Sequence, residues 1–326
     1  MKIKQKNIFL LGSTTEYSLM KEWSNSQNHY HLNGWFHDKD IPSSPGDLIK
    51  EYNQLVGNNL VDHFVLDPSG MDHEILQASL DWAEDRGSRI HMIQDGTDTL
   101  IKKLDKRDRF GPFAAVRLRP EPLSERRNIF IKKVFDLLLS ITVCSTILWW
   151  FYPLIGILIK LTSKGPIIIR QDRVGIDGNH FQCMKFRTMV SNKAAEKGFS
   201  HLTKKDDNRI TFVGKILRKT NLDELPQFLN VLTGKMSVVG PRPHMVSEDQ
   251  EIAEKIDKYR IRRFVKPGIT GYAAIKGYRG GTENLELMQK RIDYDIKYIE
   301  SWSFWLDLKI ALITFWQMIT LRTGAH

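Results

Sequence analysis

The stretch from Leu137 to Ile159 contains 23 consecutive uncharged residues. A helix of this length and composition can cross the hydrocarbon core of a bilayer. Pro153 lies about two thirds of the way along, where it removes a backbone donor and bends a helix. Basic residues flank both ends, so the positive-inside rule gives no direction of crossing: Arg126, Arg127, Lys132 and Lys133 before, and Lys160, Lys164 and Arg170 after. The sequence therefore favours a re-entrant segment that breaks at Pro153 and returns to the same face; a straight transmembrane helix is the alternative.

A second apolar stretch, Trp302 to Leu321, has a different pattern. It is interrupted by Asp307 and Lys309 and is rich in tryptophan. This composition favours a helix lying in the membrane interface over one that spans it. A buried core helix is the alternative.

Charge divides the chain unevenly. Residues 1–98 carry 8 Lys and Arg against 15 Asp and Glu, whereas residues 99–326 carry 40 against 23. We expect residues 99–326 to bind a polyanion. Nucleic acid, anionic lipid and a diphosphate substrate are the three alternatives. The two cysteines, Cys144 and Cys183, indicate neither a disulfide nor a zinc site, and the N-terminal apolar run is too short for a signal peptide. We therefore expect a reducing, cytoplasmic setting and no secretion.

The first hundred residues alternate short apolar runs with amphipathic stretches. Strands are expected at Asn7–Leu11, Phe64–Asp67 and Ile90–Ile93, and helices at Tyr17–Ser24 and His73–Arg86. This alternation predicts an α/β domain with a parallel sheet. Gly12 supplies only one of the three glycines of a dinucleotide fingerprint, so we expect a Rossmann-like shell without a working cofactor site. Residues 99–128 are charged and proline-containing, which is typical of a linker.

The decapeptide NLDELPQFLN, residues 221–230, places two carboxylates side by side at Asp223 and Glu224. Adjacent carboxylates repel each other, so keeping both ionised requires a metal or nearby Lys and Arg. Cationic residues lie close in sequence: Lys215, Arg218, Lys219 and Arg242. Pro226 suits the first turn of a helix running to Val231, which would put the pair just outside a helix N-terminus, where a phosphate can bind. Taken alone, such a dipeptide is more often a solvated surface pair.

Other short strings share this region. Strands are expected at Ile167–Arg170 and His180–Met184, and a helix at Val213–Lys219. The sequence PRP at residues 241–243 restrains the backbone on both sides of Arg242, which could aim the guanidinium at a phosphate. A solvent-facing turn is the alternative there, and the string KPGITG at residues 266–271 by itself indicates only a loop.

Together and in this order, the strings resemble the bacterial sugar transferase family, the monotopic polyprenyl-phosphate phosphoglycosyl transferases. The resemblance runs from about Arg127 to His326. It rests on the basic entry to a proline-broken apolar segment and on four strings: KFRTM at 185–189, LRKTNLDELPQFLNVLTGKMSVVGPRP at 217–243, KPGITG at 266–271 and SFWLDLKI at 303–310.

The resemblance implies a reaction and a set of site residues. Asp223 would be the nucleophile that attacks the β-phosphorus of a UDP-sugar and expels UMP, and Glu224 would bind Mg²⁺. Undecaprenyl phosphate would then accept the sugar phosphate. Four basic side chains would bind substrate phosphates: Lys185, Arg187, Arg218 and Arg242.

The expected fold class is α/β in four segments. These are a Rossmann-like accessory domain (1–115), a linker with a basic juxtamembrane part (116–130), a re-entrant helix–break–helix (131–163) and a helix-rich α/β catalytic domain with interfacial amphipathic helices (164–326). The resemblance implies the bacterial inner membrane, with the catalytic domain on the cytoplasmic face. Its partners would be the UDP-sugar, undecaprenyl phosphate and membrane lipid, with no nucleic acid. The exposed surfaces leave room for a homodimer. Many family members carry serine before the helix-breaking proline, whereas this chain has Tyr152, which leaves open how the freed carbonyls are satisfied.

Two other functions are alternatives to a sugar transferase. A nucleotide-sugar dehydratase or epimerase would need a glycine fingerprint and a Tyr-x-x-x-Lys pair, and residues 1–115 supply neither. A non-catalytic, membrane-anchored scaffold for glycan assembly remains open. The sequence does not determine which sugar is transferred, which glycan pathway is served or whether the N-terminal domain binds a ligand.

Overall fold

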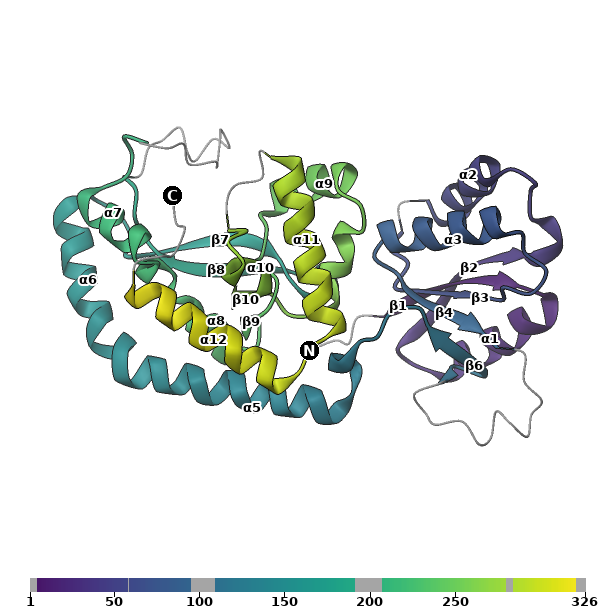
Figure 1. Cartoon of the computed structure of the whole chain (residues 1–326), viewed down its shortest axis with the longest axis horizontal. Helices are drawn as coiled ribbons and strands as arrows, with labels where there is room; N and C mark the ends of the chain where they lie inside the picture. The colour runs from purple at the N-terminus through teal and green to yellow at the C-terminus, as the bar shows by residue number, and fades with distance from the viewer. Residues whose placement is uncertain (1–4, 58, 95–108, 191–206, 280–283, 321–326) are drawn as a thin grey trace. The chain divides into compact units, whose positions relative to one another are not determined.

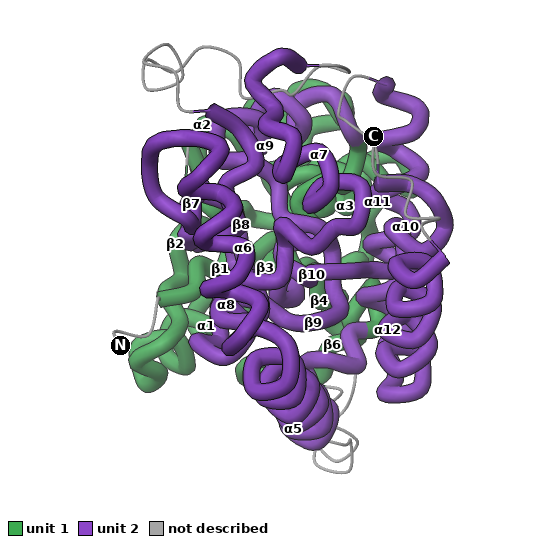
Figure 2. The backbone as a smooth tube through the Cα atoms, turned by 90° about the vertical axis from the view of Figure 1, so that its left-hand side faces the viewer, with its two compact units in different colours: residues 1–120, 257–261 green, residues 121–256, 262–326 purple. Residues whose placement is uncertain are grey.

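The computed structural model describes residues 5–57, 59–94, 109–190, 207–279 and 284–320. The chain divides into two compact units (Figure 2). Unit 1 comprises residues 1–120 and 257–261, and unit 2 comprises residues 121–256 and 262–326. Each unit is described by itself below.

Unit 1 is built on a mixed six-stranded sheet of order β2-β1-β3-β4-β6-β5. Four strands run parallel: β1 (Lys6–Gly12), β2 (Tyr30–His37), β3 (His63–Leu66) and β4 (Arg89–Ile93). The hairpin of β5 (Arg109–Phe110) and β6 (Phe113–Arg117) joins β4 in antiparallel pairing. The helices are α1 (Thr14–Ser26), α2 (Pro45–Val56) and α3 (His73–Asp85). Apolar clusters form on both faces of the sheet, because successive strand side chains point to opposite sides.

The strands and helices expected in residues 1–94 are confirmed, with longer bounds for most of them. β2 and α2 were not predicted. Residues 109–117, within the segment 99–128 expected to be a linker, belong to the sheet instead: Phe110, Phe113 and Ala115 are buried in its core. Residues 99–108 of that segment lie outside the described residues.

The turn after β1 holds a carboxylate of its own chain. Glu16 Oε2 accepts a hydrogen bond from the Ser13 backbone at 2.7 Å, and the Ser13 hydroxyl caps α1 in return. Glu16 therefore occupies a backbone donor that a dinucleotide phosphate would use. That this domain lacks a working cofactor site stays a prediction.

Unit 2 begins with a long apolar helical segment, Arg126–Thr162, which by length and composition could cross a membrane and is mostly exposed in the structure. It consists of α5 (Arg126–Val143), a π-helical turn (Cys144–Leu148) and α6 (Trp149–Thr162). Figure 1 shows α5 and α6 running in clearly different directions.

Pro153 lies inside α6 rather than at its end. A proline clashes with the carbonyl four residues before it, so the distortion falls on the preceding turns, where the π turn is found. Carbonyls there are satisfied by side chains: Thr146 Oγ1 donates to Thr142 O at 2.6 Å, and Trp150 Nε1 donates to Thr146 O at 2.7 Å. These carbonyls lie in the turns before Pro153 and differ from the Trp149 carbonyl, which loses its α-helical donor at the proline. The path of the segment through a membrane stays a prediction.

The rest of unit 2 is a mixed α/β arrangement of short elements. The antiparallel pair β7 (Ile168–Val174) and β8 (His180–Phe186) and the parallel pair β9 (Ser237–Val239) and β10 (Gly268–Thr270) are its described strands. The helices are α7 (Phe212–Lys219), α8 (Gln227–Leu232), α9 (Val246–Lys255), α10 (Tyr272–Ile275), α11 (Leu285–Glu300) and α12 (Phe304–Ile319). The expected strands and helices of this region are confirmed, with bounds that differ by a few residues.

α12 exposes five large apolar side chains, including Trp305 at 73% and Trp316 at 63%. The alternative of a buried core helix is therefore wrong for these positions. Asp307 and Ile310 are buried, and Asp307 accepts hydrogen bonds from Lys132 Nζ at 2.7 Å and from the Tyr298 hydroxyl at 2.8 Å. Asp307, one of the two charged residues that interrupt the apolar stretch, thus anchors α12 to α5 through Lys132.

Candidate active site

Asp223 and Glu224 lie in a 3-10 turn, Leu222–Glu224, between α7 and α8. Asn221 starts this turn with a left-handed backbone conformation, φ 56°, which asparagine tolerates better than most residues. Both acidic residues are buried, so the pair is not the solvated surface dipeptide considered from the sequence.

Glu224 is held by two cations from distant parts of the chain. Lys185 Nζ, on β8, donates to Glu224 Oε1 at 2.8 Å. Arg242 donates from Nη2 to Oε1 at 2.7 Å and from Nη1 to Oε2 at 3.2 Å. Burial alone raises the pKa of the Glu224 carboxyl, but the charges of Arg242 and Lys185 overcome this and hold its pKa well below the usual range. Glu224 is therefore a carboxylate at neutral pH.

Asp223 differs from its neighbour in having no hydrogen bond or ion pair within the described part of the chain. Burial and the adjacent Glu224 charge raise the pKa of Asp223 to about 6, against the opposing charges of Lys185, Arg218 and Arg242. A carboxylate with a raised pKa and no fixed partner is more basic than an ordinary aspartate and free to form a bond.

The loop that carries Arg242 follows β9 and lies against the KPGITG segment. Gly240 N donates to Thr270 O at 2.8 Å, and Gly268 N donates to Pro241 O at 2.9 Å. A side chain at Gly268 or Gly271 would collide with the backbone of Gly240. The glycines of KPGITG therefore allow the two backbones to approach closely enough to fix the PRP loop, a role that the string alone did not reveal.

Arg218 reaches the site from the last turn of α7. Its Nε donates to the Thr188 hydroxyl at 2.8 Å, and its charge acts on Asp223. α7 can lie this close to Thr188 because Gly214 has no side chain; a larger residue there would collide with the Thr188 backbone. The structure thus brings Asp223, Glu224, Lys185, Arg218 and Arg242 together, as the sequence predicted.

Arg187 lies apart from this cluster. It is buried beside Gly165, and its Nη2 donates to Ser163 O at 2.7 Å, directly after the end of α6. Its Nε and Nη1 are buried without a hydrogen-bond partner among the described residues. Its predicted binding of substrate phosphate stays a prediction.

Sequence reasoning missed two further arginines. Arg173, on β7, and Arg279 lie close enough to Arg242 and Glu224 for their charges to interact. Burial and then the charge of Arg242 lower the pKa of both guanidinium groups, which remain cationic. Neither Arg173 nor Arg279 lies in one of the sequence motifs described above. The only indication from the sequence was that both lie in its basic part.

Glu224, the residue expected to bind Mg²⁺, has both carboxylate oxygens hydrogen-bonded to Lys185 and Arg242. The described residues contain no group of three or more His, Cys, Asp or Glu side chains placed to hold a metal. Magnesium binding at Glu224 stays a prediction.

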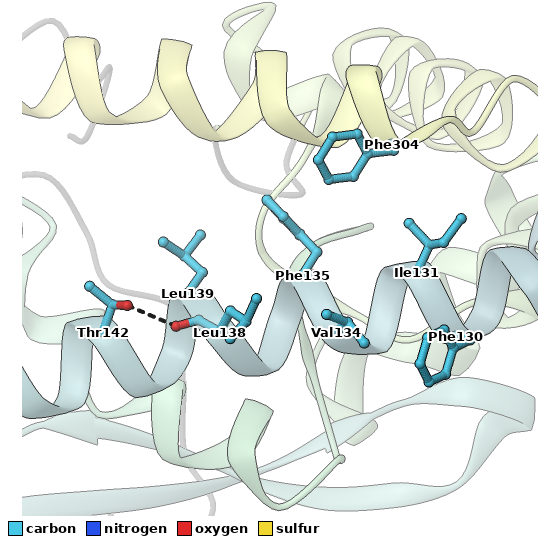
Figure 3. Close-up of a pocket in the computed structure, with 8 residues that line it drawn as sticks. All are labelled: Phe130, Ile131, Val134, Phe135, Leu138, Leu139, Thr142 and Phe304. Atoms are coloured by element: carbon cyan, nitrogen blue, oxygen red, sulfur yellow. Dashed lines mark hydrogen bonds between the residues drawn. The ribbon is translucent and has the colours of Figure 1, made fainter.

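An apolar groove of about 550 Å³ runs along α5 (Figure 3). The residues that line it are Phe130, Ile131, Val134, Phe135, Leu138, Leu139, Thr142 and Phe304. Thr142 is its one polar residue, and the hydroxyl is satisfied internally by Leu138 O at 2.9 Å. The groove therefore offers almost only apolar surface, in contrast to the charged cluster around Asp223.

Comparison with known proteins gives consistent results. The model of the family "Bacterial sugar transferase" matches residues 127–321. The UDP-glucose:undecaprenyl-phosphate glucose-1-phosphate transferase of Klebsiella pneumoniae is 46% identical over 69% of this chain and 50% of its own length. The protein of the same name from Caulobacter vibrioides is 41% identical over 69% of this chain and 84% of its own length. An Aeromonas hydrophila UDP-N-acetylgalactosamine-undecaprenyl-phosphate N-acetylgalactosaminephosphotransferase is 38% identical over 72% and 52%. The chain spans about half the length of several of the curated relatives it matches.

Proposed function

Because the chain belongs to the bacterial sugar transferase family, we propose that it transfers a sugar-1-phosphate from a UDP-sugar to undecaprenyl phosphate and releases UMP. The observation that carries this proposal is the contrast between Asp223, which is buried and unpaired among the described residues, and Glu224, which two cations hold. That arrangement provides a free nucleophile in a positively charged setting.

In the first half of the reaction, an Asp223 oxygen forms a bond to the β-phosphorus of the UDP-sugar. The bond between that phosphorus and the oxygen bridging to the α-phosphate breaks, and UMP leaves with the bridging oxygen and its electron pair. The sugar phosphate is left on Asp223 as an acyl phosphate. Splitting the transfer in this way lets a soluble donor and a lipid acceptor use one site in turn.

The cations make this attack feasible. A carboxylate approaches phosphorus against the repulsion of the phosphate oxygens, and Lys185, Arg218 and Arg242 reduce that repulsion and stabilise UMP as it departs. Arg173 and Arg279 add to the same positive field. A magnesium ion held by Glu224, together with oxygens of the donor diphosphate, would neutralise further charge on the leaving group.

In the second half, a phosphate oxygen of undecaprenyl phosphate attacks the same phosphorus. The bond from phosphorus to Asp223 breaks, so the product is a sugar-diphospho-lipid and Asp223 is again a carboxylate. No net redox change occurs, and the chain's own groups are restored.

The acceptor is a membrane lipid, and the apolar surfaces of unit 2 support a membrane-interface location. Phe130 is 67% exposed in the groove on α5, and α12 exposes a row of large apolar residues. We propose that α5 and α6 enter and leave the bacterial inner membrane on its cytoplasmic face, with the bend near Pro153 at the deepest point. The Rossmann-like unit 1 is then a cytoplasmic accessory domain.

The product would begin assembly of a surface glycan such as capsule, exopolysaccharide, O-antigen or a protein-linked glycan. UDP-glucose is the first donor to test, because two of the compared relatives are named for it, and UDP-N-acetylgalactosamine and UDP-galactose follow. A homodimer stays compatible with this function.

The test is UMP release from that panel of donors by detergent-solubilised protein with undecaprenyl phosphate and Mg²⁺. We expect release with one donor or a small set, and none above background from Asp223→Asn. If folded wild-type protein releases no UMP from any donor, the non-catalytic scaffold becomes the better account.

A further inference from the structure

Helix α11 carries two buried charged residues that the proposed mechanism does not use. Arg291 and Asp295 are spaced by four residues, so they lie one above the other on the same face of the helix. Buried charges are costly unless they are paired and hydrogen-bonded, and both of these side chains bond to residues outside α11.

Arg291 donates to two separate loops. Its Nε donates to Tyr278 O at 3.0 Å, and its Nη1 lies 3.3 Å from His244 Nε2. Tyr278 directly precedes Arg279, and His244 follows Arg242 by two residues, at the end of the PRP loop. One guanidinium therefore contacts the chain beside both of these site arginines.

His244 must act as the acceptor in its contact with Arg291. Arginine has only donors, so the facing imidazole nitrogen has to offer its lone pair, which requires the neutral ring with the proton on Nδ1. Burial and then the charges of Arg262, Arg291, Arg173 and Arg242 lower the pKa of His244 well below its usual value. The imidazole is thus a neutral link between α11 and the PRP loop.

Asp295 reaches the same loop through Arg262. Arg262 Nη2 donates to Asp295 Oδ2 at 2.9 Å and also to the backbone carbonyl of Arg242. Arg173 Nη1, on β7, donates to Pro243 O at 3.3 Å. The backbone around Arg242 is consequently held at three successive residues.

We propose that Arg291 is a positioning residue that fixes the PRP loop and the loop of Arg279 in one geometry, so that Arg242 and Arg279 bind the donor diphosphate together. The inference rests on the proposed function, because it assumes that both arginines face the phosphates. A lysine at position 291 would keep the charge, but its donors all sit on one nitrogen and could not reproduce donation from two separate nitrogens of a planar guanidinium.

The test measures the affinity of the full-length, detergent-solubilised protein for UDP by titration calorimetry, with the thermal unfolding temperature measured alongside. We expect Arg291→Lys to weaken UDP binding about tenfold, within the range for residues that support ligand-binding groups. The matched control is Lys290→Met, because Lys290 lies next to Arg291 on α11 but forms a half-exposed pair with Glu286. That variant should bind UDP like the wild type.

A second pair of variants tests the link through position 244. His244→Gln keeps an acceptor for Arg291 and should bind UDP within about threefold of the wild type, whereas His244→Phe removes the acceptor and should lose about tenfold. This pair decides the question if Arg291→Lys does not fold. Folded Arg291→Lys or His244→Phe protein with wild-type affinity for UDP would overturn the proposal.

A double-variant cycle separates positioning from a direct contact. If Arg291 acts through Arg279, the loss caused by Arg291→Lys should shrink in an Arg279→Lys background, whereas equal losses in both backgrounds would contradict the inference. The readout does not depend on turnover. A protein that binds UDP but releases no UMP would disprove the proposed function and leave this inference standing, and one that binds no UDP would overturn the inference.

Discussion

Asp223 and Glu224 are neighbours in one 3-10 turn, yet within the described residues only Glu224 is bound to cations. Lys185 and Arg242 bind both oxygens of Glu224, whereas the Asp223 carboxylate has no hydrogen-bond partner among the residues that the structure describes. Two chemically similar side chains thereby acquire different properties: Glu224 is a fixed anion, and Asp223 is a buried carboxylate with a raised pKa. The proposed division into nucleophile and electrostatic partner follows from this difference.

The pH dependence of turnover tests the state of Asp223. Because the nucleophile must be ionised and its pKa lies at about 6, kcat/KM for the donor should rise with pH through that value and level off above it. The charge of Lys185 opposes the raised pKa, so Lys185→Met should move the midpoint to higher pH. The exposed Lys215, on α7, gives the control Lys215→Met, which should leave the midpoint in place. A midpoint unaffected by either change would show that another group titrates.

Arg242 offers a test of bidentate pairing. Arg242→Lys retains a positive charge but loses one of the two hydrogen bonds to Glu224, so we expect kcat/KM to fall by roughly 10- to 100-fold. Steady-state kinetics with the preferred UDP-sugar would measure this. Activity equal to wild type would mean that only the charge at this position matters.

Thr188 should position Arg218. Thr188→Val removes the hydroxyl that accepts from Arg218 Nε, and loss of one hydrogen bond to a charged group predicts a drop in kcat/KM of about 10-fold or more. Thr188→Ser keeps the hydroxyl and should retain most of the activity. Equal losses in the two variants would contradict this role, because Thr188→Ser retains the hydroxyl that accepts from Arg218 Nε.

Lys132 tests the anchoring of α5 to the rest of unit 2. It is buried and donates to Asp307 at 2.7 Å and to Val239 O at 2.9 Å. Lys132→Met leaves buried Asp307 without its cation and should destabilise the protein by about 3–5 kcal/mol, seen as a lower unfolding temperature in detergent. Lys133 is exposed and adjacent to Lys132, so Lys133→Met should change the unfolding temperature little. Equal effects of the two substitutions would argue against the buried contacts of Lys132 with Asp307 and Val239.

Removal of residues 1–120 tests whether unit 1 is accessory. All the site residues named above belong to unit 2, so the truncated protein in membranes should keep UMP release. Loss of activity from a remainder that is still folded would show that unit 1 takes part in the reaction.

The sequence predicted which residues gather around Asp223, and their roles stay predictions. Asp223, Glu224, Lys185, Arg218 and Arg242 stand in short strings whose order identified them, and the structure gathers all five. Arg187 stands in the same string as Lys185, but it follows the end of β8 and bonds to the Ser163 carbonyl. Membership in a motif did not predict the direction of that side chain.

Elements determined by tertiary contacts escaped prediction. The sequence of β2, YHLNGWFH, mixes polar and apolar residues without regular alternation, and its pairing with β1 contains an irregularity after Ile8. The role of Arg291 was equally hidden, since its partners lie 13 and 47 residues away in the chain. The contacts of Arg291 depend on how the loops of Tyr278 and His244 fold, and the local sequence does not determine this.

The most direct measurement is to trap the covalent intermediate. Protein incubated with UDP-glucose labelled at the β-phosphate, or with the donor selected from the panel, should carry label in the absence of acceptor. The label should map to the peptide containing Asp223, disappear on addition of undecaprenyl phosphate and be absent from Asp223→Asn. UMP release that requires both substrates at once, with no labelled protein at any time, would contradict the account.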